Sequence, residues 1–412
     1  MMLVFDFYRH DFISIYKYKK GFIMTTNEKA LQLHEEWNGK LTTESKCTIQ
    51  SREDLALAYT PGVAEPCKVI AKDKEAAYKY TIKANTVAVI SDGSAVLGLG
   101  NIGPYAAMPV MEGKSVLFKS FGDVNAFPIC LDTQDTEEII KTCVNIAPAF
   151  GGINLEDISA PRCFEIEERL KELLDIPVFH DDQHGTAIVV LAGIINGLRI
   201  TGKKKEECKV VINGAGSAGI AITKLLLTYG FTNVTMCDIN GIIGENSKDL
   251  NWMQKSMVEV TNPEKKTGTL ADALVGADIF VGVSAPNIVT PEMVKTMNSD
   301  SIMFAMANPV PEIMPDVAKA AGARIVGTGR SDFPNQVNNV IAFPGIFRGA
   351  LLGRASQITE KMKLAAANAI AYLVPDDKLN DDFILPEAFD PNVRDAVCKA
   401  VMDNIESTNI SK

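Results

Sequence analysis

The sequence predicts an α/β protein in which a smaller first domain precedes a doubly wound, Rossmann-type domain and a helical tail. After Gly185, apolar runs of strand length alternate with helical segments, as in parallel strands that are covered on both faces. The length of 412 residues also indicates more than one domain. The expected parts are a poorly ordered extension at 1–23, a first domain at 24–185, the Rossmann-type domain at 186–345, and a tail at 346–412 that packs back on the first domain.

In the first domain, apolar spacing and turn residues define the expected elements. The spacing of Ala30, Leu31 and Trp37 is helical, and the acidic start of 136–147 suits a helix N-terminus. The expected helices are 27–39, 136–147 and 164–174, and the expected strands are 86–90, 116–119, 126–131 and 176–179.

In the second domain, strands and helices are expected to alternate along the chain. The expected strands are 209–213, 233–238, 278–283, 301–307 and 324–328, and the expected helices are 218–229, 270–275, 291–297 and 316–321. This order is the pattern of a parallel sheet with helices on both faces.

Composition argues against several classes of protein. The chain carries 41 basic and 51 acidic side chains, a net charge of −10, which argues against a nucleic-acid partner. Its eight cysteines include no C-x-x-C pair, which favours reduced thiols in a cytoplasmic protein. The longest apolar stretch, 187–198, is too short to span a membrane. Charges interrupt the aromatic segment 1–23, so no signal peptide is expected there.

A glycine motif indicates a dinucleotide site in the second domain. The pattern G-x-G-x-x-G at 214–219 follows an expected strand and opens an expected helix. In this context Gly214 makes a tight turn, Gly216 lets the backbone approach a pyrophosphate, and Gly219 packs the helix on the strand. The predicted cofactor-binding residues of the loop are Gly214, Ala215, Gly216, Ser217, Ala218 and Gly219.

The next strand ends in Asp238, which suits the ribose hydroxyls of NAD and would repel a 2′-phosphate. Lys248 lies close enough in sequence to leave NADP open. A second match, at 98–103, is interpreted as a glycine-rich turn, because the helix after it is expected to be short and to be broken by Pro109.

Two acidic pairs predict a metal site. Glu156-Asp157 and Asp181-Asp182 both follow apolar strand ends, where an uncompensated carboxylate would be costly. Three such oxygens suit Mg²⁺ or Mn²⁺. The competing zinc hypothesis, based on His180 and His184, is disfavoured because a strand rather than a helix precedes them.

Two further side chains are candidates for proton transfer. Lys114 is a lone lysine that we expect to enter an apolar strand at 115–118, and burial beside carboxylates would prepare it as a general base. Tyr59 lies in a turn, and a phenol near a lysine can serve as a proton donor.

Taken in order from about Met24, these motifs resemble those of the malic enzyme family, in its short bacterial type. The motifs are DLALAYTPGVAEPC, SDGSAVLGLGNIGPYAAMPVMEGKSVLFK, INLEDISAPRC, PVFHDDQHGTA, INGAGSAG, ANPVPE and QVNNVIAFPG. The resemblance implies oxidative decarboxylation of L-malate to pyruvate and CO₂, with reduction of NAD or NADP, dependence on a divalent metal, and a homodimer. The same-fold alternatives are oxaloacetate decarboxylation and a malolactic activity, and the alternative from another class is a non-catalytic NAD-binding regulatory protein.

The resemblance also implies roles for single residues. Tyr59 would be the general acid and Lys114 the general base, with Asp181 tuning Lys114. The metal ligands would be Glu156, Asp157 and Asp182, and Asn308 and Asn339 would contact substrate or nicotinamide. Where larger relatives carry a substrate-binding arginine this chain has Ala95, so asparagine side chains or another arginine, such as Arg330, would hold the substrate carboxylate.

Overall fold

The computed structural model describes residues 25–96, 98–406 and 409, in one unit up to Thr43 and a second from Glu44. The extension expected at 1–23 lies outside the described residues. The described part of the first unit holds α1 (Thr26–Trp37). A capping box starts this helix: the Thr25 hydroxyl accepts from the Glu28 N–H, and the Glu28 carboxylate accepts from the Thr25 N–H.

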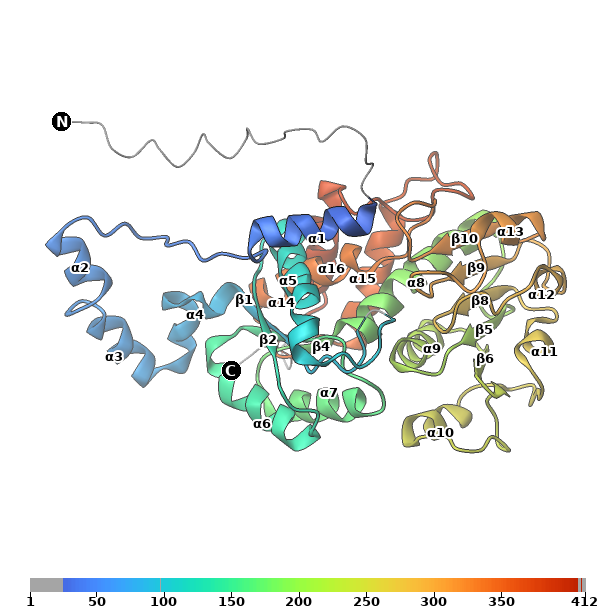
Figure 1. The fold of residues 1–412 in the computed structure, drawn as a ribbon, viewed down its shortest axis with the longest axis horizontal. Coiled ribbons are helices and arrows are strands. Elements are labelled where there is room, and N and C mark those ends of the chain that lie inside the picture. The colour runs from blue at the N-terminus through green and yellow to red at the C-terminus, as the bar shows by residue number, and fades with distance from the viewer. Residues whose placement is uncertain (1–24, 97, 407–408, 410–412) are drawn as a thin grey trace. The chain divides into compact units, whose positions relative to one another are not determined.

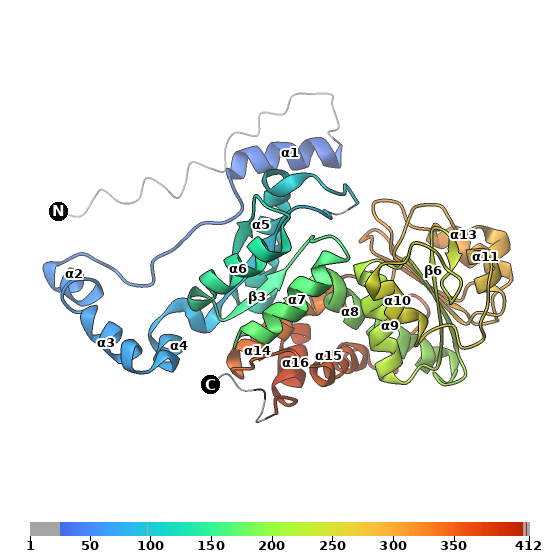
Figure 2. The ribbon, with the colours of Figure 1, turned by 90° about the horizontal axis from the view of Figure 1, so that it is seen from below.

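The second unit contains two sheets (Figures 1 and 2). The first sheet is parallel, in the order β2-β1-β3-β4. Its strands are β1 (Thr86–Ser91), β2 (Asn125–Cys130), β3 (Gly152–Leu155) and β4 (Val178–His180). Its helices are α5 (Gly103–Gly122), α6 (Thr136–Ile146) with the 3₁₀ turn η3 (Ala147–Ala149), and α7 (Arg162–Leu173). Every residue of β1 is buried, as expected for a central parallel strand covered on both faces.

An arm of short helices precedes this sheet. It consists of α2 (Arg52–Ala58), α3 (Ala64–Lys72), η1 (Lys74–Ala76) and α4 (Ala77–Tyr80), and η2 (Ile82–Asn85) joins it to β1. None of these five helices has a buried residue. In both views α2 and α3 project away from the sheets (Figures 1 and 2). The arm therefore leaves apolar side chains such as Leu57 exposed, at 70% of the residue's surface.

The helix α8 (Asp181–Thr201) connects the two sheets. It begins directly after β4, and Ile188 to Gly197 are all buried. Gly193 and Gly197 allow it to approach β9 (Ile302–Ala305), because a Cβ at these positions would lie 2.9 and 2.6 Å from side-chain atoms of that strand. The helix is long and apolar enough to cross a membrane by length and composition, but 72% of that window is buried inside the protein, as in a core helix.

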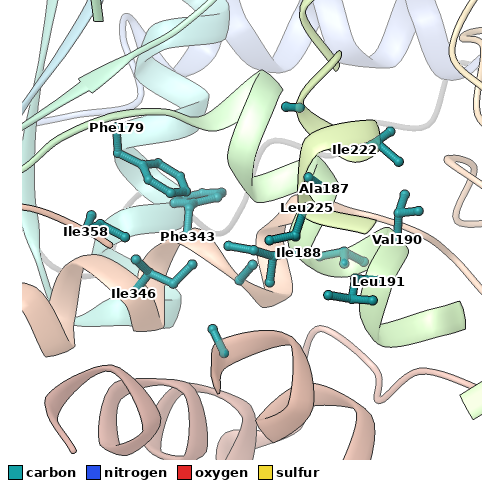
Figure 3. Close-up of a cluster of buried hydrophobic side chains, with 14 of the residues drawn as sticks. Phe179, Ala187, Ile188, Val190, Leu191, Ile222, Leu225, Phe343, Ile346 and Ile358 are labelled. Carbon is teal, nitrogen blue, oxygen red and sulfur yellow. The ribbon is translucent and has the colours of Figure 1, made fainter. Parts of the chain in front are cut away.

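The core around α8 joins the two domains and the tail. Figure 3 shows Ile188 and Leu191 of α8 in one cluster with Leu225 of α9 (Ser217–Tyr229) and with Phe343 and Ile346 of α14 (Phe343–Leu352). These residues are nearly or fully buried, so the apolar side chains of three chain segments form one continuous core.

The second sheet has the order β10-β9-β8-β5-β6-β7, and only β7 pairs antiparallel. Its strands are β5 (Lys209–Asn213), β6 (Asn233–Asp238), β7 (Gly241–Ile242), β8 (Ile279–Gly282), β9 (Ile302–Ala305) and β10 (Ile325–Thr328). The helices of this domain are α9 (Ser217–Tyr229), α10 (Trp252–Val258), α11 (Leu270–Leu274), α12 (Pro291–Lys295) and α13 (Pro315–Ala320). Val210 and Ile212 belong to the core with α8 and α9, whereas Val211 belongs to the core with α11, α12 and α13. The sheet is therefore doubly wound, as the sequence predicts.

The C-terminal part of the chain forms η4 (Asn339–Ile341), α14 (Phe343–Leu352), α15 (Glu360–Tyr372) and α16 (Pro391–Met402), and the expected start of the tail at 346 falls inside α14. The helix α14 packs on α5, whereas α15 packs on α8 and α9. Edge-to-face contacts of Phe118 with Phe343 and Phe347 join the tail to the first domain. The tail thus contacts the first domain and also the helix that links the two sheets.

One expected strand is wrong. Residues 116–119 belong to α5, which is 20 residues long and continues through Pro109. The buried residues Ala107, Met111, Lys114 and Phe118 repeat at helical intervals, and the short apolar run alone did not distinguish a strand from a helix. Pro109 has no N–H to donate to the carbonyl of Tyr105, four residues earlier. Tyr105 is 86% exposed, so water can replace this hydrogen bond.

Candidate active site

Lys114 is the centre of a buried charge cluster at the first sheet. Its residue is 8% exposed, and its Nζ lies 2.6 Å from Asp181 Oδ2 and 2.8 Å from Glu156 Oε1. The ring of Phe343 covers the ammonium at 4.5 Å from the ring centroid. Glu156 follows β3 and Asp181 follows β4, so neighbouring parallel strands deliver both carboxylates to the same edge of the sheet.

Three carboxylates beside this lysine form a candidate metal centre. Oxygen atoms of Glu156, Asp157 and Asp182 lie within 4.8 Å of one another. The Asp157 N–H donates to Asp182 Oδ2 at 2.8 Å, which ties the end of β3 to the first turn of α8. Hard oxygen donors in such a group suit Mg²⁺ or Mn²⁺. No histidine belongs to this cluster of described residues.

The charges of the cluster do not balance without a cation. Three carboxylates, those of Asp181, Glu156 and Asp182, act on one ammonium. Burial raises the pKa of the Glu156 and Asp181 carboxyls, and the ammonium of Lys114 opposes this rise. Burial would lower the pKa of Lys114, but Asp181 and Glu156 outweigh it and hold that pKa above its ordinary value. A divalent cation would reduce the excess negative charge, so the residues present fit the metal that the sequence predicts.

A glycine-rich loop closes the other side of the cluster. Residues 92–103, apart from residue 97, follow β1, and the Ala95 N–H donates to the Asp157 carbonyl at 2.9 Å. A Cβ on Gly98 would lie 2.8 Å from the Asn308 carbonyl. The first glycine motif thus faces the predicted substrate residue Asn308. The expectation of a short helix after this motif is wrong, because α5 has 20 residues.

The predicted asparagines lie at the edges of this region. Asn339 starts η4, and a Cβ placed on Gly185 would lie 3.2 Å from Asn339 Cβ and 1.8 Å from Asp181 Oδ1. Asn339 is therefore close to the Lys114 cluster. Arg330 lies beside the Asn308 loop, because it donates to the Pro309 carbonyl at 3.1 Å, but its guanidinium also forms a two-point ion pair with Asp332.

The second glycine motif lines a pocket of about 630 Å³ beyond the end of β5. The pocket is lined by Gly214, Ala215, Gly216 and Asp238, and Ala160 of the first domain also contributes to it. Gly214 has a φ of +115°, and a Cβ on Gly219 would lie 1.8 Å from the Gly214 carbonyl oxygen. A Cβ on Gly216 would meet no atom within 4 Å, which leaves open space above the backbone for a pyrophosphate. Ser217 and Ala218 begin α9, whose N-terminus has no side-chain cap.

The structure does not bring Tyr59 to Lys114 within one chain. Tyr59 ends α2 on the projecting arm and is 66% exposed, whereas Lys114 is buried. Sequence reasoning placed a phenol near the lysine, and this expectation is wrong for a single chain. The physical reason is that residues 52–80 have no core of their own against which to fold back.

Sequence reasoning also missed several site residues. Asn154 donates to Glu156 Oε2 at 2.8 Å, and a polar residue inside the apolar strand INL was the available signal. Ser284 and Gln254 line the nucleotide pocket. Ser284 lies just beyond β8, and the rule that ligands bind at the carboxyl ends of parallel strands would have indicated it. Nothing in the local sequence indicated Gln254, whose amide reaches the Ala215 carbonyl at 3.1 Å.

The fold and site define an α/β oxidoreductase with a Rossmann-type nucleotide domain and an acidic cluster with a buried lysine. The family model "Malic enzyme, N-terminal domain" matches residues 38–138 and 133–171, and "Malic enzyme, NAD binding domain" matches residues 183–406. The chain therefore belongs to the malic enzyme family and is an NAD(P)-dependent enzyme.

Named relatives agree over nearly the whole chain. The chain is 56% identical over 390 residues to a bifunctional malic/malolactic enzyme of Bacillus subtilis (strain 168), covering 94% of this chain and 95% of the relative. It is also 56% identical over 390 residues to an NAD-dependent malic enzyme of Geobacillus stearothermophilus, covering 95% and 81%. A crystal structure of an NAD-dependent malic enzyme from Thermotoga maritima has a TM-score of 0.88 at 53% identity, covering 90% of this chain and 98% of that one.

Proposed function

We propose that this protein catalyses the oxidative decarboxylation of L-malate to pyruvate and CO₂, with NAD as hydride acceptor and Mg²⁺ or Mn²⁺ as metal. The observation that carries the proposal is the buried Lys114 between Glu156 and Asp181, directly beside three carboxylates that fit a divalent cation. A binding module has no need for a buried lysine and a metal site together, which argues against the regulatory alternative.

In this proposal Glu156, Asp157 and Asp182 hold the metal. When bound, the metal supplies Lewis-acid stabilisation of the negative charge that develops as CO₂ leaves. In its neutral amine form Lys114 accepts the proton of the C2 hydroxyl while the C2 hydride passes to the nicotinamide, and Asp181, whose Oδ2 lies 2.6 Å from Nζ, orients and tunes the lysine. Asn308 and Asn339 hold substrate or nicotinamide at the two edges of the site.

We propose that the pocket of the second domain binds NAD in preference to NADP. Asp238 lines the pocket, and its carboxylate accepts from the Asn240 N–H at 2.7 Å, which fixes it for ribose hydroxyls. No lysine or arginine is among the described residues that line this pocket. Lys248 lines a neighbouring cavity of about 1020 Å³ that shares Asp238, so it is the one candidate for a 2′-phosphate contact that sequence reasoning raised.

We further propose a homodimer in which the arm of one chain serves its partner. The exposed apolar residues of 52–80 need a covering surface, and Tyr59 on this arm is remote from the lysine of its own chain. A second copy would satisfy both requirements, with Tyr59 donating the proton that enolpyruvate takes at carbon. Mixing inactive K114A and Y59F variants tests this: activity reappears only if hybrid dimers combine residues of two chains.

The activity is tested by following NADH at 340 nm with L-malate and Mn²⁺, in parallel with NADP. We expect NADH formation with release of pyruvate, and a smaller rate with NADP. Absence of nicotinamide reduction with either cofactor would contradict the proposal, and conversion of oxaloacetate alone would support the decarboxylase alternative.

The malolactic alternative has one specific observation in its favour, the name of the relative from Bacillus subtilis, which is bifunctional. We propose it as a second activity of the same site, in which pyruvate is reduced before NADH leaves. Lactate formed from malate without net NADH would identify it.

The remaining proposals concern organisation and place in the cell. We keep the domain division at 24–185, 186–345 and 346–412, although residue 185 lies within the first turns of α8. All eight cysteines are free, which supports placing the protein in the reducing cytoplasm.

A further inference from the structure

A second buried charge cluster lies behind the metal-site helix. It joins three helices through Glu167 of α7, His184 of α8 and Lys363 of α15. His184 Nε2 lies 2.8 and 2.9 Å from the two oxygens of Glu167, and Lys363 Nζ lies 3.0 Å from His184 Nδ1. Glu167 is 4% and Lys363 3% exposed. The proposed reaction uses none of these groups.

The chemistry of the three groups fixes the direction of their hydrogen bonds. The ammonium of Lys363 only donates, so His184 Nδ1 accepts and the proton of the imidazole resides on Nε2. Nε2–H then donates to the Glu167 carboxylate. The chain of donors runs in one direction, from Lys363 through His184 to Glu167, and only a neutral His184 satisfies it.

Glu167 connects this cluster to the start of the metal-site helix. Its Oε1 accepts from the backbone N–H of His180 at 3.3 Å and pairs with Lys171 at 2.7 Å. His180 is the N-cap residue of α8, and α8 has no side-chain cap of its own. Asp181 and Asp182 follow immediately, so the position of His180 and the rotation of α8 determine where these carboxylates point.

We propose that Lys363, His184 and Glu167 are positioning residues that set the affinity of the metal site by fixing the first turn of α8. The inference rests on the proposed metal ligands Glu156, Asp157 and Asp182. Holding the helix from α7 and α15 restricts Asp182 to the arrangement in which its oxygen lies near those of Glu156 and Asp157. Partners that orient metal ligands are typically worth about 10- to 100-fold in metal affinity.

Matched variants on one helix test this inference. Lys363→Met keeps a long unbranched side chain and removes the donor. Lys361→Met makes the same change at an exposed lysine of α15 whose partner, Glu406, is also exposed. A cavity of about 170 Å³ lined by Lys363 and His184 leaves room for Lys363→Arg, which restores a donor. The measurement is the Kd for Mn²⁺ of the full-length protein, from the electron paramagnetic resonance signal of free Mn²⁺.

We expect K363M to raise the Kd for Mn²⁺ about 10-fold or more, K363R to restore most of the affinity, and K361M to leave it unchanged. The Kd for NAD stays the same in all three. If K363M does not fold, as judged by circular dichroism, E167Q is measured instead and is expected to raise the Kd for Mn²⁺ in the same way. An unchanged Kd in a folded K363M or E167Q variant overturns the inference. Failure of the metal site itself is distinguished by D182N, which must lose Mn²⁺ affinity if the proposed ligands are right.

Discussion

Each of the two sheets carries a site beyond the carboxyl ends of its strands, but the two sites are built from different groups. Beyond the ends of β3 and β4, the first sheet places charged side chains in nearly full burial, with Lys114 8% and Glu156 3% exposed. Beyond the end of β5, the second sheet offers an open pocket lined by glycine backbone and small residues. The first site depends on compensated charge and the second on room for a ligand next to peptide N–H groups. Substitutions in the two sites should therefore fail for different reasons.

The largest effect is expected at the charged site. Lys114→Ala should lower kcat by about 10³-fold, because general acid–base groups contribute about 10²- to 10⁴-fold, and should leave the Kd for NAD unchanged. Steady-state kinetics and calorimetric titration measure the two quantities. Lys119→Ala, at an exposed lysine of the same helix, is the control and should keep wild-type turnover. Near-normal malate oxidation by K114A would remove Lys114 from the mechanism.

In the nucleotide pocket of the second sheet, a substitution that fills the space above the glycine backbone is expected to weaken NAD binding. Gly216→Ala has room in the protein itself, since a Cβ there meets no atom within 4 Å, but the methyl group would occupy the approach of the pyrophosphate. We expect an unchanged Tm and a Kd for NAD raised about 30- to 100-fold, equivalent to about 2–3 kcal/mol. Gly219→Ala is the contrasting variant and should lower the Tm, because its Cβ would lie 1.8 Å from the Gly214 oxygen. Equal NAD affinity in G216A would contradict the pyrophosphate assignment.

The second buried charge cluster, of Glu167, His184 and Lys363, should make the stability of the fold depend on pH. Burial lowers the pKa of His184 to about 4, against the opposing charge of Glu167, so the folded protein keeps this imidazole neutral. Between pH 4 and 6.5 the unfolded chain binds a proton that the folded protein does not, and stability therefore rises with pH across this window. Acidification from pH 7 to 5 should remove about 2 kcal/mol through this group.

Urea unfolding of metal-free wild type and His184→Gln at both pH values measures this contribution as the difference between their pH dependences. His34→Gln, at a partly exposed histidine, is the control. The same pH dependence in H184Q and wild type would show that His184 does not titrate as its burial requires.

The smallest expected change concerns the choice of nucleotide. Asp238→Asn removes the charge that opposes a 2′-phosphate, and the preference for NAD over NADP should fall by about 10-fold, or about 1.4 kcal/mol. The ratio of kcat/KM for the two cofactors measures it. A ratio that does not move would assign the selectivity to other residues, with Lys248→Ala as the next variant.

The comparison of sheets also explains what the sequence could predict. The second domain was predictable almost element by element, and β5 and β6 coincide with the expected 209–213 and 233–238, because a continuous apolar strand followed by a glycine turn is a local signal. The first domain was not, since 116–119 in the buried helix α5 has the composition of a strand. The local sequence pattern therefore predicts secondary structure correctly only where packing against the rest of the fold favours the same element.

Some residues of the candidate site could likewise be predicted from the sequence, and others could not. The acidic pairs and Lys114 were predictable from carboxylates at apolar strand ends and from motif order, and the structure brings them together. The location of Tyr59 was not predictable, because it depends on packing of the arm, and neither were Glu167 and Lys363, which meet His184 only through the tertiary fold.

The helix α8 sets the angular relation between the two chemistries. Its first turn carries Asp181 and Asp182, and 12 to 16 residues later Gly193 and Gly197 lie against β9 of the other sheet. Each residue of an α-helix turns the chain by about 100°. Inserting a single residue between positions 185 and 193 would therefore rotate the metal carboxylates by more than a quarter turn relative to the nucleotide sheet. The number of residues in this segment therefore fixes the orientation of the metal carboxylates relative to the nucleotide sheet. A change in its length should lower activity far more than most side-chain substitutions in the same segment.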